Sequence, residues 1–391
     1  MRTLKIFSFL YLFAVLGLFL YSFTQVDLSL TFSRIEFLRN ITSWFQHIGY
    51  FDRPLSTYLY VSLLIALYSL YGYLLFAAIK NKLTTTFVWR LIMITTGILL
   101  FSYNAFSYDI FNYIFDAKIL THYHQNPYLH KALDFPTDPM LSFMRWTHRV
   151  YPYGPLWLAI TVPLSFVGFG IFLPTFFLFK SLMAASFIGT LYFMQKILRK
   201  IAPEKEVFGL IFLGLSPFML IEYLVSAHLD IVMMFFATWA FYLLIQKRLI
   251  WAWVLLLISI GIKFATVFIV PVFLMVTILQ IKHKKFSWNA VVLWSIVLLL
   301  GATLTASLRT NFQPWYLLEP LIFAAFLSWR YFIFIPSIVL TFFALLTYVP
   351  YLYVGNWDKP IPQNLTIMYL ISYASSLLIV CGVFVSRRLK K

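Results

Sequence analysis

Long apolar runs are the feature that most constrains what this chain can fold into. Its 391 residues are 62% hydrophobic and 11% charged, and the mean hydropathy is +0.86. A soluble globular protein carries about 25% charged residues, so this chain cannot cover itself with polar surface. Runs of about 20 apolar residues match the thickness of a bilayer. We therefore predict an all-α, polytopic transmembrane bundle of about 12 spans, with residues 1–391 forming a single transmembrane domain and no separate soluble domain.

Twelve segments have the length and apolar content of membrane-spanning helices. They fall at about 4–23, 55–79, 87–105, 173–197, 207–225, 227–246, 249–262, 264–281, 287–308, 315–328, 331–351 and 365–386. Residues 249–281 would be about 50 Å long as one helix, which is too long for one span, so we expect a break at Gly261-Ile262-Lys263. The N-terminal run is too long for the core of a signal peptide and lacks a small-x-small cleavage site. We expect it to be retained as the first helix.

The distribution of basic residues predicts the orientation of the chain. With both termini in the cytoplasm, 19 of the 30 Lys and Arg residues fall on the inner side, against two of the 13 acidic residues, Glu204 and Glu206. This is the positive-inside pattern of membrane proteins. The whole net charge of +17 then faces the anionic inner leaflet, so it indicates contact with membrane lipids and not with nucleic acid. We predict a multi-pass protein of a bacterial plasma membrane with both termini cytoplasmic.

One segment, residues 107–158, is unusually polar for this chain and contains four His, four Asp, two Arg and two Lys. The orientation places residues 106–152 outside, and the span that begins near Pro174 also starts outside. Residues 155–172 are apolar, yet they must begin and end on the same side. We expect an interfacial helix or a shallow re-entrant hairpin there. We predict that residues 106–172 form an outer catalytic loop.

Two carboxylates in this loop are candidates for chemistry. Asp109 lies where a span ends and the loop begins, and Asp116 follows seven residues later, so on a helix the two share a face. A partly desolvated carboxylate at the membrane edge suits a general base that accepts a proton from a sugar hydroxyl. We predict Asp109 as the catalytic residue and Asp116 as a substrate-binding residue. The alternative, that they are ordinary solvated loop acids, stays open from the residues alone.

Further along the loop, Asn126-Pro127-Tyr128 is typical of a turn. Arg145, His148 and Arg149 precede the aromatic segment from Tyr151 to Pro155. Guanidinium and imidazole groups beside an interfacial helix suit a phosphate. Anchoring at the level of lipid headgroups is an equally good interpretation of each residue by itself.

Ionisable residues far from this loop also fall on the outer side. Glu222, His228 and Asp230 lie at a predicted outer turn, Lys263 at an outer helix end, and Arg309 at the start of RTNFQPWYLLEP. Ionisable residues at membrane depth are costly and usually functional, so we expect these positions to converge on one site. The predicted substrate-binding residues are Asp116, Asn126, Tyr128, His148, Arg149, Tyr153, His228, Asp230, Lys263, Arg309, Gln313 and Trp315.

The sequence defines no metal site. His122 and His124 form a His-x-His pair, but the carboxylates around them are too loosely spaced to complete a ligand set. We therefore predict no metal ligands. A divalent cation is the one cofactor that the sequence leaves open.

The segment SYDIFNYIFDAKILTHYHQNPY, followed by YPYGPLWLAI, resembles the polyprenol-phosphate-mannose-dependent mannopyranosyltransferases of the GT-C superfamily. Those enzymes carry an Asp-x-x-x-Tyr segment, an Asn/Asp-Pro-Tyr turn and a Tyr-Gly-Pro-Leu element, which correspond here to 109–113, 126–128 and 153–156. The segments 227–234, 261–271 and 313–321 are similar too. Glu319 departs from the pattern, because an apolar residue or Trp is expected before Pro320.

The resemblance implies a GT-C-like fold with juxtamembrane helices in the large outer loop. It implies an inverting hexosyltransferase, with mannose as the expected sugar, a polyprenyl-phosphate-linked donor and a glycolipid or glycan acceptor on the outer face. A secondary transporter or lipid flippase also fits twelve spans and broken helices. A structural envelope protein fits the composition but leaves the outer charges unexplained.

Overall fold

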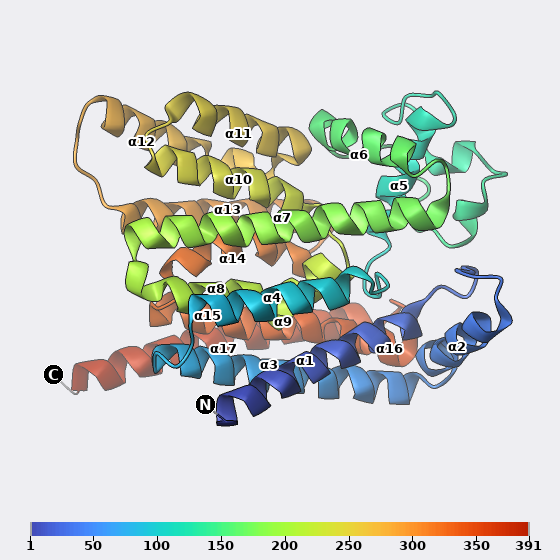
Figure 1. Cartoon of the computed structure of the whole chain (residues 1–391), viewed down its shortest axis with the longest axis horizontal. Helices are drawn as coiled ribbons and strands as arrows, with labels where there is room; N and C mark the ends of the chain where they lie inside the picture. The colour runs from blue at the N-terminus through green and yellow to red at the C-terminus, as the bar shows by residue number, and fades with distance from the viewer. Residues whose placement is uncertain (1, 390–391) are drawn as a thin grey trace.

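The computed structural model describes residues 2–389 as an all-α bundle (Figure 1). Within that range, β-structure is limited to one isolated bridge between Lys131 and Val150. The predicted all-α polytopic fold is confirmed. Lys390 and Lys391, which the predicted orientation places on the inner side, lie outside the described residues, as does Met1.

Seven helical segments within residues 2–389 are long and apolar enough to cross a membrane. They are Leu4–Gln25 (α1, Arg2–Ser22, with the turn after it), α3 (Arg53–Ile79), α7 (Phe172–Ile201), Phe264–Ile281 (η7, Phe264–Ile269, with α12, Val270–Ile281), α13 (Trp288–Thr310), Tyr331–Val354 (α15, Tyr331–Leu346, with α16, Tyr348–Val354) and Ile361–Arg387 in α17 (Ile361–Leu389). An eighth is bent by 45° between α8 (Glu206–Gly214) and the pair α9 (Pro217–Met219) and η6 (Leu220–Val225).

Five further apolar helical segments are shorter than a full crossing. They are α4 (Thr85–Leu100), α6 (Pro155–Val167), α10 (Asp230–Ile245), α11 (Leu249–Ile262) and Pro314–Leu327, which joins η8 (Pro314–Leu317), α14 (Leu318–Ala324) and η9 (Ala325–Leu327). Each of the twelve predicted spans therefore corresponds to an apolar helical segment, and four of the twelve are short. The remaining short helix, α6, occupies the segment that we expect in the interface. Its place relative to the bilayer stays a prediction.

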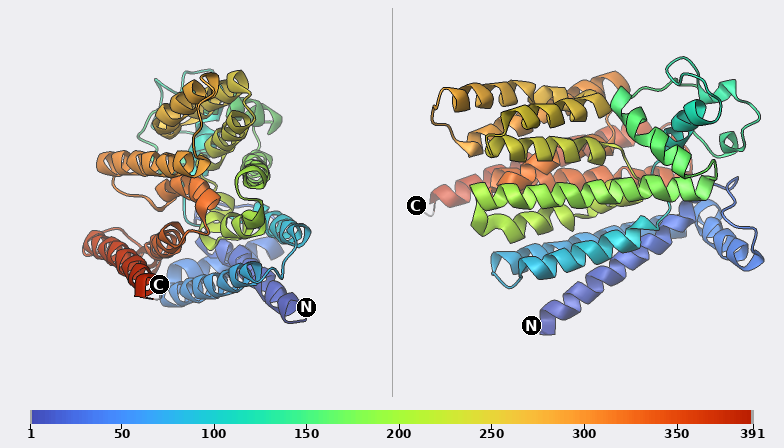
Figure 2. Two further views of the ribbon diagram at one scale, coloured as in Figure 1. Left: turned by 90° about the vertical axis from the view of Figure 1, so that its left-hand side faces the viewer. Right: turned by 45° about the horizontal axis from the view of Figure 1, so that its top comes forward.

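The helices run roughly parallel, and the two ends of the bundle differ (Figures 1 and 2). The connections from α3 to α4, from α7 to α8 and from α12 to α13 lie at one end, and both termini point toward it. The opposite end carries α2 (Glu36–Gln46), α5 (Asp109–Thr121), α6 and the irregular loop between the last two. The candidate loop and the basic connections thus lie at opposite ends of the bundle.

The expected helix break at Lys263 is present. Helix α11 ends at Ile262, Lys263 is extended with φ −151° and ψ 137°, and η7 follows. The backbone N–H of Gly154 donates to the carbonyl oxygen of Ile262 at 3.0 Å, which satisfies one of the open carbonyl groups at the helix end. A Cβ atom on Gly154 would lie 2.1 Å from the carbonyl oxygen of Gly261, so this contact requires glycine. The Tyr-Gly-Pro-Leu element therefore fixes the end of α11 and the position of Lys263.

A second break separates η6 from α10. The buried ammonium of Lys180 on α7 donates to the carbonyl oxygens of Leu224 and Val225 and to the hydroxyl of Ser102. Ala227 has a φ of +61°, a left-handed conformation that costs a non-glycine residue about 1 kcal/mol or more. The turn that presents His228 is therefore strained and held by a buried cation.

Candidate functional site

Helix α5 presents one polar face toward the bundle. Asp109 is its first residue, and the Asp109 N–H donates to Ser107 Oγ at 3.1 Å. A carboxylate at this position interacts favourably with the positive end of the helix dipole. Tyr113, one turn later, is buried and packs edge-on against Tyr153 with ring centroids 5.4 Å apart. Asp116 lies a further turn along the same face.

Asp109 is connected to the bundle interior by a chain of ionisable groups. Its Oδ2 lies 3.4 Å from Nδ1 of His228, and Nε2 of His228 lies 3.2 Å from Oε2 of Glu222. The hydroxyl of Tyr348 on α16 donates to Oε1 of Glu222 at 3.0 Å. His228, Glu222 and Tyr348 are buried. The chain thus links α5 to η6, to the turn before α10 and to α16.

The ring of Trp315 in η8 stacks on His228, with centroids 4.2 Å apart and planes 21° from parallel. Gln313 precedes this turn and is half-buried. Both Gln313 and Trp315 are partly exposed, and Trp315 contacts the chain of ionisable groups directly.

A second group of charges lies at the start of α10. Nζ of Lys263 is 2.5 Å from Oδ1 of Asp230, and the ammonium lies 5.6 Å from the ring centre of Tyr316. Glu319, on α14, is buried against the same pair. Two carboxylates therefore share one ammonium, and the charge of Lys263 is already compensated by Asp230.

Asp116 differs from Asp109 in having no charged neighbour. It is half-buried, and no hydrogen bond or ion pair of its carboxyl group occurs within residues 2–389. Burial raises the pKa of Asp116 to about 8. At neutral pH its carboxyl group is therefore mainly protonated and can donate a hydrogen bond to a ligand.

The predicted turn at Asn126-Pro127-Tyr128 is present and packs on the Tyr-Gly-Pro-Leu element. Oδ1 of Asn126 accepts from the N–H of Tyr128 at 2.9 Å, and the hydroxyl of Tyr128 donates to the carbonyl oxygen of Tyr153 at 3.2 Å. The N–H of Tyr151 donates to the carbonyl oxygen of Pro127 at 3.0 Å. These bonds hold the turn against the segment that carries the Tyr-Gly-Pro-Leu element.

Three of the predicted binding residues, Arg149, His148 and Arg309, lie outside the buried charge groups, whereas the predicted Lys263 lies within one. Arg149 is exposed and sits over the ring of Trp146 at 4.4 Å, and His148 is exposed beside the same ring. Arg309 is exposed at the end of α13. Neither arginine pairs with a carboxylate in the part of the chain that the structure describes. The two guanidinium groups and the imidazole of His148 stay available to a ligand at the surface.

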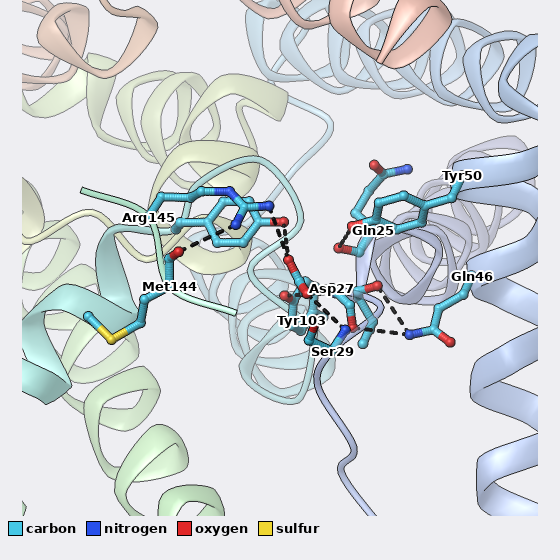
Figure 3. Close-up of polar contacts among 10 residues, drawn as sticks. Gln25, Asp27, Ser29, Gln46, Tyr50, Tyr103, Met144 and Arg145 are labelled. Atoms are coloured by element: carbon cyan, nitrogen blue, oxygen red, sulfur yellow. Dashed lines mark hydrogen bonds and ion pairs between the residues drawn. The ribbon is translucent and has the colours of Figure 1, made fainter. Parts of the chain in front are cut away.

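Arg145 has a different role, which Figure 3 shows. Its Nη2 lies 3.4 Å from Oδ2 of the buried Asp27, and the guanidinium stacks over Tyr108 at 4.9 Å. The Tyr108 hydroxyl donates to the same Asp27 oxygen at 3.1 Å. Asp27, from the loop after α1, therefore holds the residue that immediately precedes Asp109.

The structure brings together six of the thirteen residues that the sequence predicts for the site. Those in or against the two charge groups are Asp109, Tyr153, His228, Asp230, Lys263 and Trp315. Glu222 was placed at the correct turn, but its contact with His228 was not predicted. Glu319 was noted only as a departure from a motif, although an acid in an apolar segment is a signal by itself. Asp27 was missed, and nothing in its local sequence marks it.

Two observations bear on ligands. No group of three or more His, Cys, Asp or Glu side chains arranged to hold a metal ion occurs within residues 2–389, and the divalent cation stays open. A groove of about 770 Å³ lies between α4 and α7 and is lined mainly by apolar and small side chains, such as Gly97 and Ala184. None of the candidate site residues lines it.

The raised pKa of Asp116 predicts a pH-dependent effect of Asp116→Asn on stability. The folded-state pKa of about 8 lies above the unfolded value of about 4, so the folded chain binds more protons between these pH values and loses stability as pH rises through this window. Asparagine does not ionise. The variant should melt well above the wild type near pH 9 and close to it near pH 4, as measured by thermal unfolding in detergent. Asp134→Asn, at an exposed loop acid, is the control, and an equal difference at both pH values would contradict the assignment.

The contact between Lys263 and Asp230 predicts non-additive effects on stability. Lys263→Met leaves Asp230 without its cation, and Asp230→Asn leaves Lys263 without its closest carboxylate, with Glu319 still nearby. Each should cost about 3 kcal/mol, the lower end for a buried pair, because Lys263 keeps some contact with water. The double variant should cost clearly less than the sum. Chemical unfolding of all four proteins measures this coupling. Additive losses would show that the two charges do not depend on each other.

One of three comparisons with known proteins identifies relatives of this chain. No curated protein and no solved structure matches the chain. Residues 13–280 match the family described as alpha-(1->6)-mannopyranosyltransferase, N-terminal domain. The match covers more than half of the chain, including α5, the Tyr-Gly-Pro-Leu element, His228, Asp230 and Lys263. It favours a transferase over a transporter or flippase. The chain belongs to this family of membrane mannosyltransferases of the GT-C type.

Proposed function

We propose that this mannosyltransferase is an inverting enzyme that takes mannose from a polyprenyl-phosphate donor and transfers it to a glycolipid or glycan acceptor at the outer face of the membrane. Its partners would be that donor, that acceptor and the surrounding lipids. The observation that carries the proposal is the unequal exposure of the clustered acids. The Asp109 side chain is 17% exposed, whereas Asp230 and Glu222 are 2% and 0% exposed. Asp109 is the ionisable acid of the cluster that a substrate can reach.

Asp109 is the proposed general base. Its carboxylate accepts the proton of the acceptor hydroxyl while the hydroxyl oxygen attacks the anomeric carbon of the mannose. The bond between that carbon and the donor phosphate oxygen breaks, and the phosphate leaves with the electron pair. One displacement of this kind inverts the anomeric configuration. Asp116, which is mainly protonated at neutral pH, suits a hydrogen bond to a sugar hydroxyl better than it suits proton removal.

The leaving group is a phosphate and needs positive charge more than a proton. We assign the exposed Arg149 and Arg309 to it, because their charges are not compensated by carboxylates within residues 2–389, and the exposed imidazole of His148 as a further hydrogen-bond donor. Lys263 is 24% exposed and can contribute one N–H donor, but Asp230 holds most of its charge. The aromatic side chains of Tyr128, Tyr153 and Trp315 would pack against the sugar. Asn126 and Gln313 are further proposed substrate-binding residues.

Asp109→Asn tests the assignment of the base. Asparagine keeps the shape of the side chain but cannot accept the proton, so kcat should fall by about 10² to 10⁴ while donor affinity changes little. The measurement is transfer from radiolabelled polyprenyl-phosphate mannose to a lipid extract by the purified enzyme. Asp134→Asn is the matched control, since Asp134 is an exposed acid of the same loop that contacts only its neighbours His130 and Lys131. Turnover near the wild-type value in Asp109→Asn would exclude Asp109 as the base.

The outer location of the site predicts which positions a membrane-impermeant maleimide can reach. In a Cys381→Ser background, which removes the one native thiol, we place single cysteines at Leu129 in the outer loop and at Lys284 between α12 and α13. Both positions are exposed at opposite ends of the bundle. Leu129→Cys should label in intact spheroplasts, and Lys284→Cys only after permeabilisation. The reverse pattern would place the termini outside and the proposed site in the cytoplasm.

A further inference from the structure

His228 is buried between two acids in a place that no substrate can reach. Its side chain is 0% exposed, with Asp109 3.4 Å from one ring nitrogen and Glu222 3.2 Å from the other. The stacked ring of Trp315 covers one face of the imidazole. The sequence predicted His228 as a substrate-binding residue. Its complete burial argues against direct contact with substrate and points to an action through Asp109.

The two contacts determine the protonation state of the His228 imidazole. A neutral imidazole donates from one nitrogen and accepts at the other, so it would turn a lone pair toward one of the two carboxylates. Only the doubly protonated ring presents a donor to both. The ring of Trp315 stabilises a cation at this distance as well. The surroundings of His228 therefore favour the imidazolium.

We infer that His228 is a positioning residue: a buried imidazolium, anchored by Glu222, that holds the Asp109 carboxylate ionised and aimed at the acceptor hydroxyl. This inference rests on the proposed role of Asp109 as the base. It adds a residue that touches no substrate and a second acid, Glu222, whose function is to hold that residue. Glu222 is itself fixed by the hydroxyl of Tyr348.

Both ring nitrogens of His228 lie at ion-pair distance from their carboxylates, and neither contact meets the full geometric criteria for a hydrogen bond. Charge attraction therefore acts together with the donor that the ring presents to Asp109. The strained Ala227 and the Lys180 cap fix the turn, so the ring position is set by the backbone. An imidazolium at 3.4 Å favours the ionised form of Asp109 without a well-aligned hydrogen bond.

The other titratable groups near this chain come from five helices and from the loop before α6. Asp109 and Tyr113 belong to α5, and Glu222 belongs to η6. Tyr60 of α3, Tyr348 of α16 and Tyr153 of the loop lie against these acids, and Asp230 of α10 lies within electrostatic range of Tyr113 and Tyr153. None of the tyrosines carries a positive charge. His228 is therefore the cation that faces Asp109 from the bundle, and Arg145 is held by Asp27 instead.

The test compares His228→Asn with His228→Gln. The amide nitrogen of Asn can occupy the place of Nδ1, next to Asp109, and that of Gln the place of Nε2, next to Glu222. Both variants lose the positive charge, so the acidic limb of the pH profile of kcat/KM should move up by about one pH unit or more in both. His228→Asn keeps a donor to Asp109, so it should retain at least tenfold more kcat than His228→Gln. The donor KM should stay within twofold of wild type in both.

The outcomes separate this inference from the proposed function. If Asp109→Asn, assayed in parallel, keeps wild-type turnover, the proposed base is wrong and the role of His228 fails with it. If Asp109→Asn is inactive but both His228 variants keep the wild-type acidic limb, His228 is only structural and the base assignment survives. Equal losses of kcat in both variants, in proportion to the fraction of folded protein by size-exclusion chromatography, would also overturn the inference. If His228→Gln fails to fold, the pH profile of His228→Asn decides alone.

Discussion

The ionic contact between Asp109 and His228 is the link on which the site depends, because it ties a loop outside the membrane helices to the interior of the bundle. Charged groups in an apolar bundle are costly unless they have partners, and here the partners come from two distant parts of the chain, the start of α5 and the end of η6. Asp109 begins α5, His228 follows η6, and Glu222 lies within η6. The site is therefore assembled only when these ends are held together. Lys180 caps the end of η6 through its carbonyl oxygens, and the N–H of Gly154 caps the end of α11 at Ile262.

The loop after α1 takes part in the same assembly. Asp27 accepts from the hydroxyl of Tyr108 and from Arg145, and Gln46 of α2 donates to the carbonyl oxygens of Val26 and Asp27 (Figure 3). Tyr108 is the residue before Asp109, so the start of α5 is held by Asp27 outside the bundle and by His228 inside it. A base that removes a proton needs this kind of support, since a displacement of about 1 Å can cost two orders of magnitude in rate.

Much of this architecture could be predicted from the sequence because bilayer length and charge placement act over whole segments. The twelve apolar segments, the break at Lys263 and the convergence of Asp109, His228, Asp230 and Lys263 follow from hydropathy, helix geometry and the side on which basic residues fall. The contact of Glu222 with His228 could not be predicted, because it depends on a π-helical turn and on a left-handed residue at Ala227. The same holds for Asp27, whose partners lie 81 and 118 positions away.

The interior of the site and its rim carry charges of opposite sign. The interior groups Asp109, Glu222, Asp230 and Glu319 outnumber the interior cations His228 and Lys263, and both of those cations are already paired. A dianionic or monoanionic phosphate would be repelled from such a place, whereas the hydroxyl groups of a sugar would find acceptors there. The uncompensated guanidinium groups of Arg149 and Arg309 are exposed, and so is the imidazole of His148. For the proposed reaction, this distribution favours a sugar between the acids and the exposed guanidinium groups, with its phosphate turned outward and the attacking hydroxyl turned toward Asp109. In this arrangement each partner would meet groups of complementary charge, and Asp109, as the proposed base, would depend on the buried His228 to stay ionised among other acids.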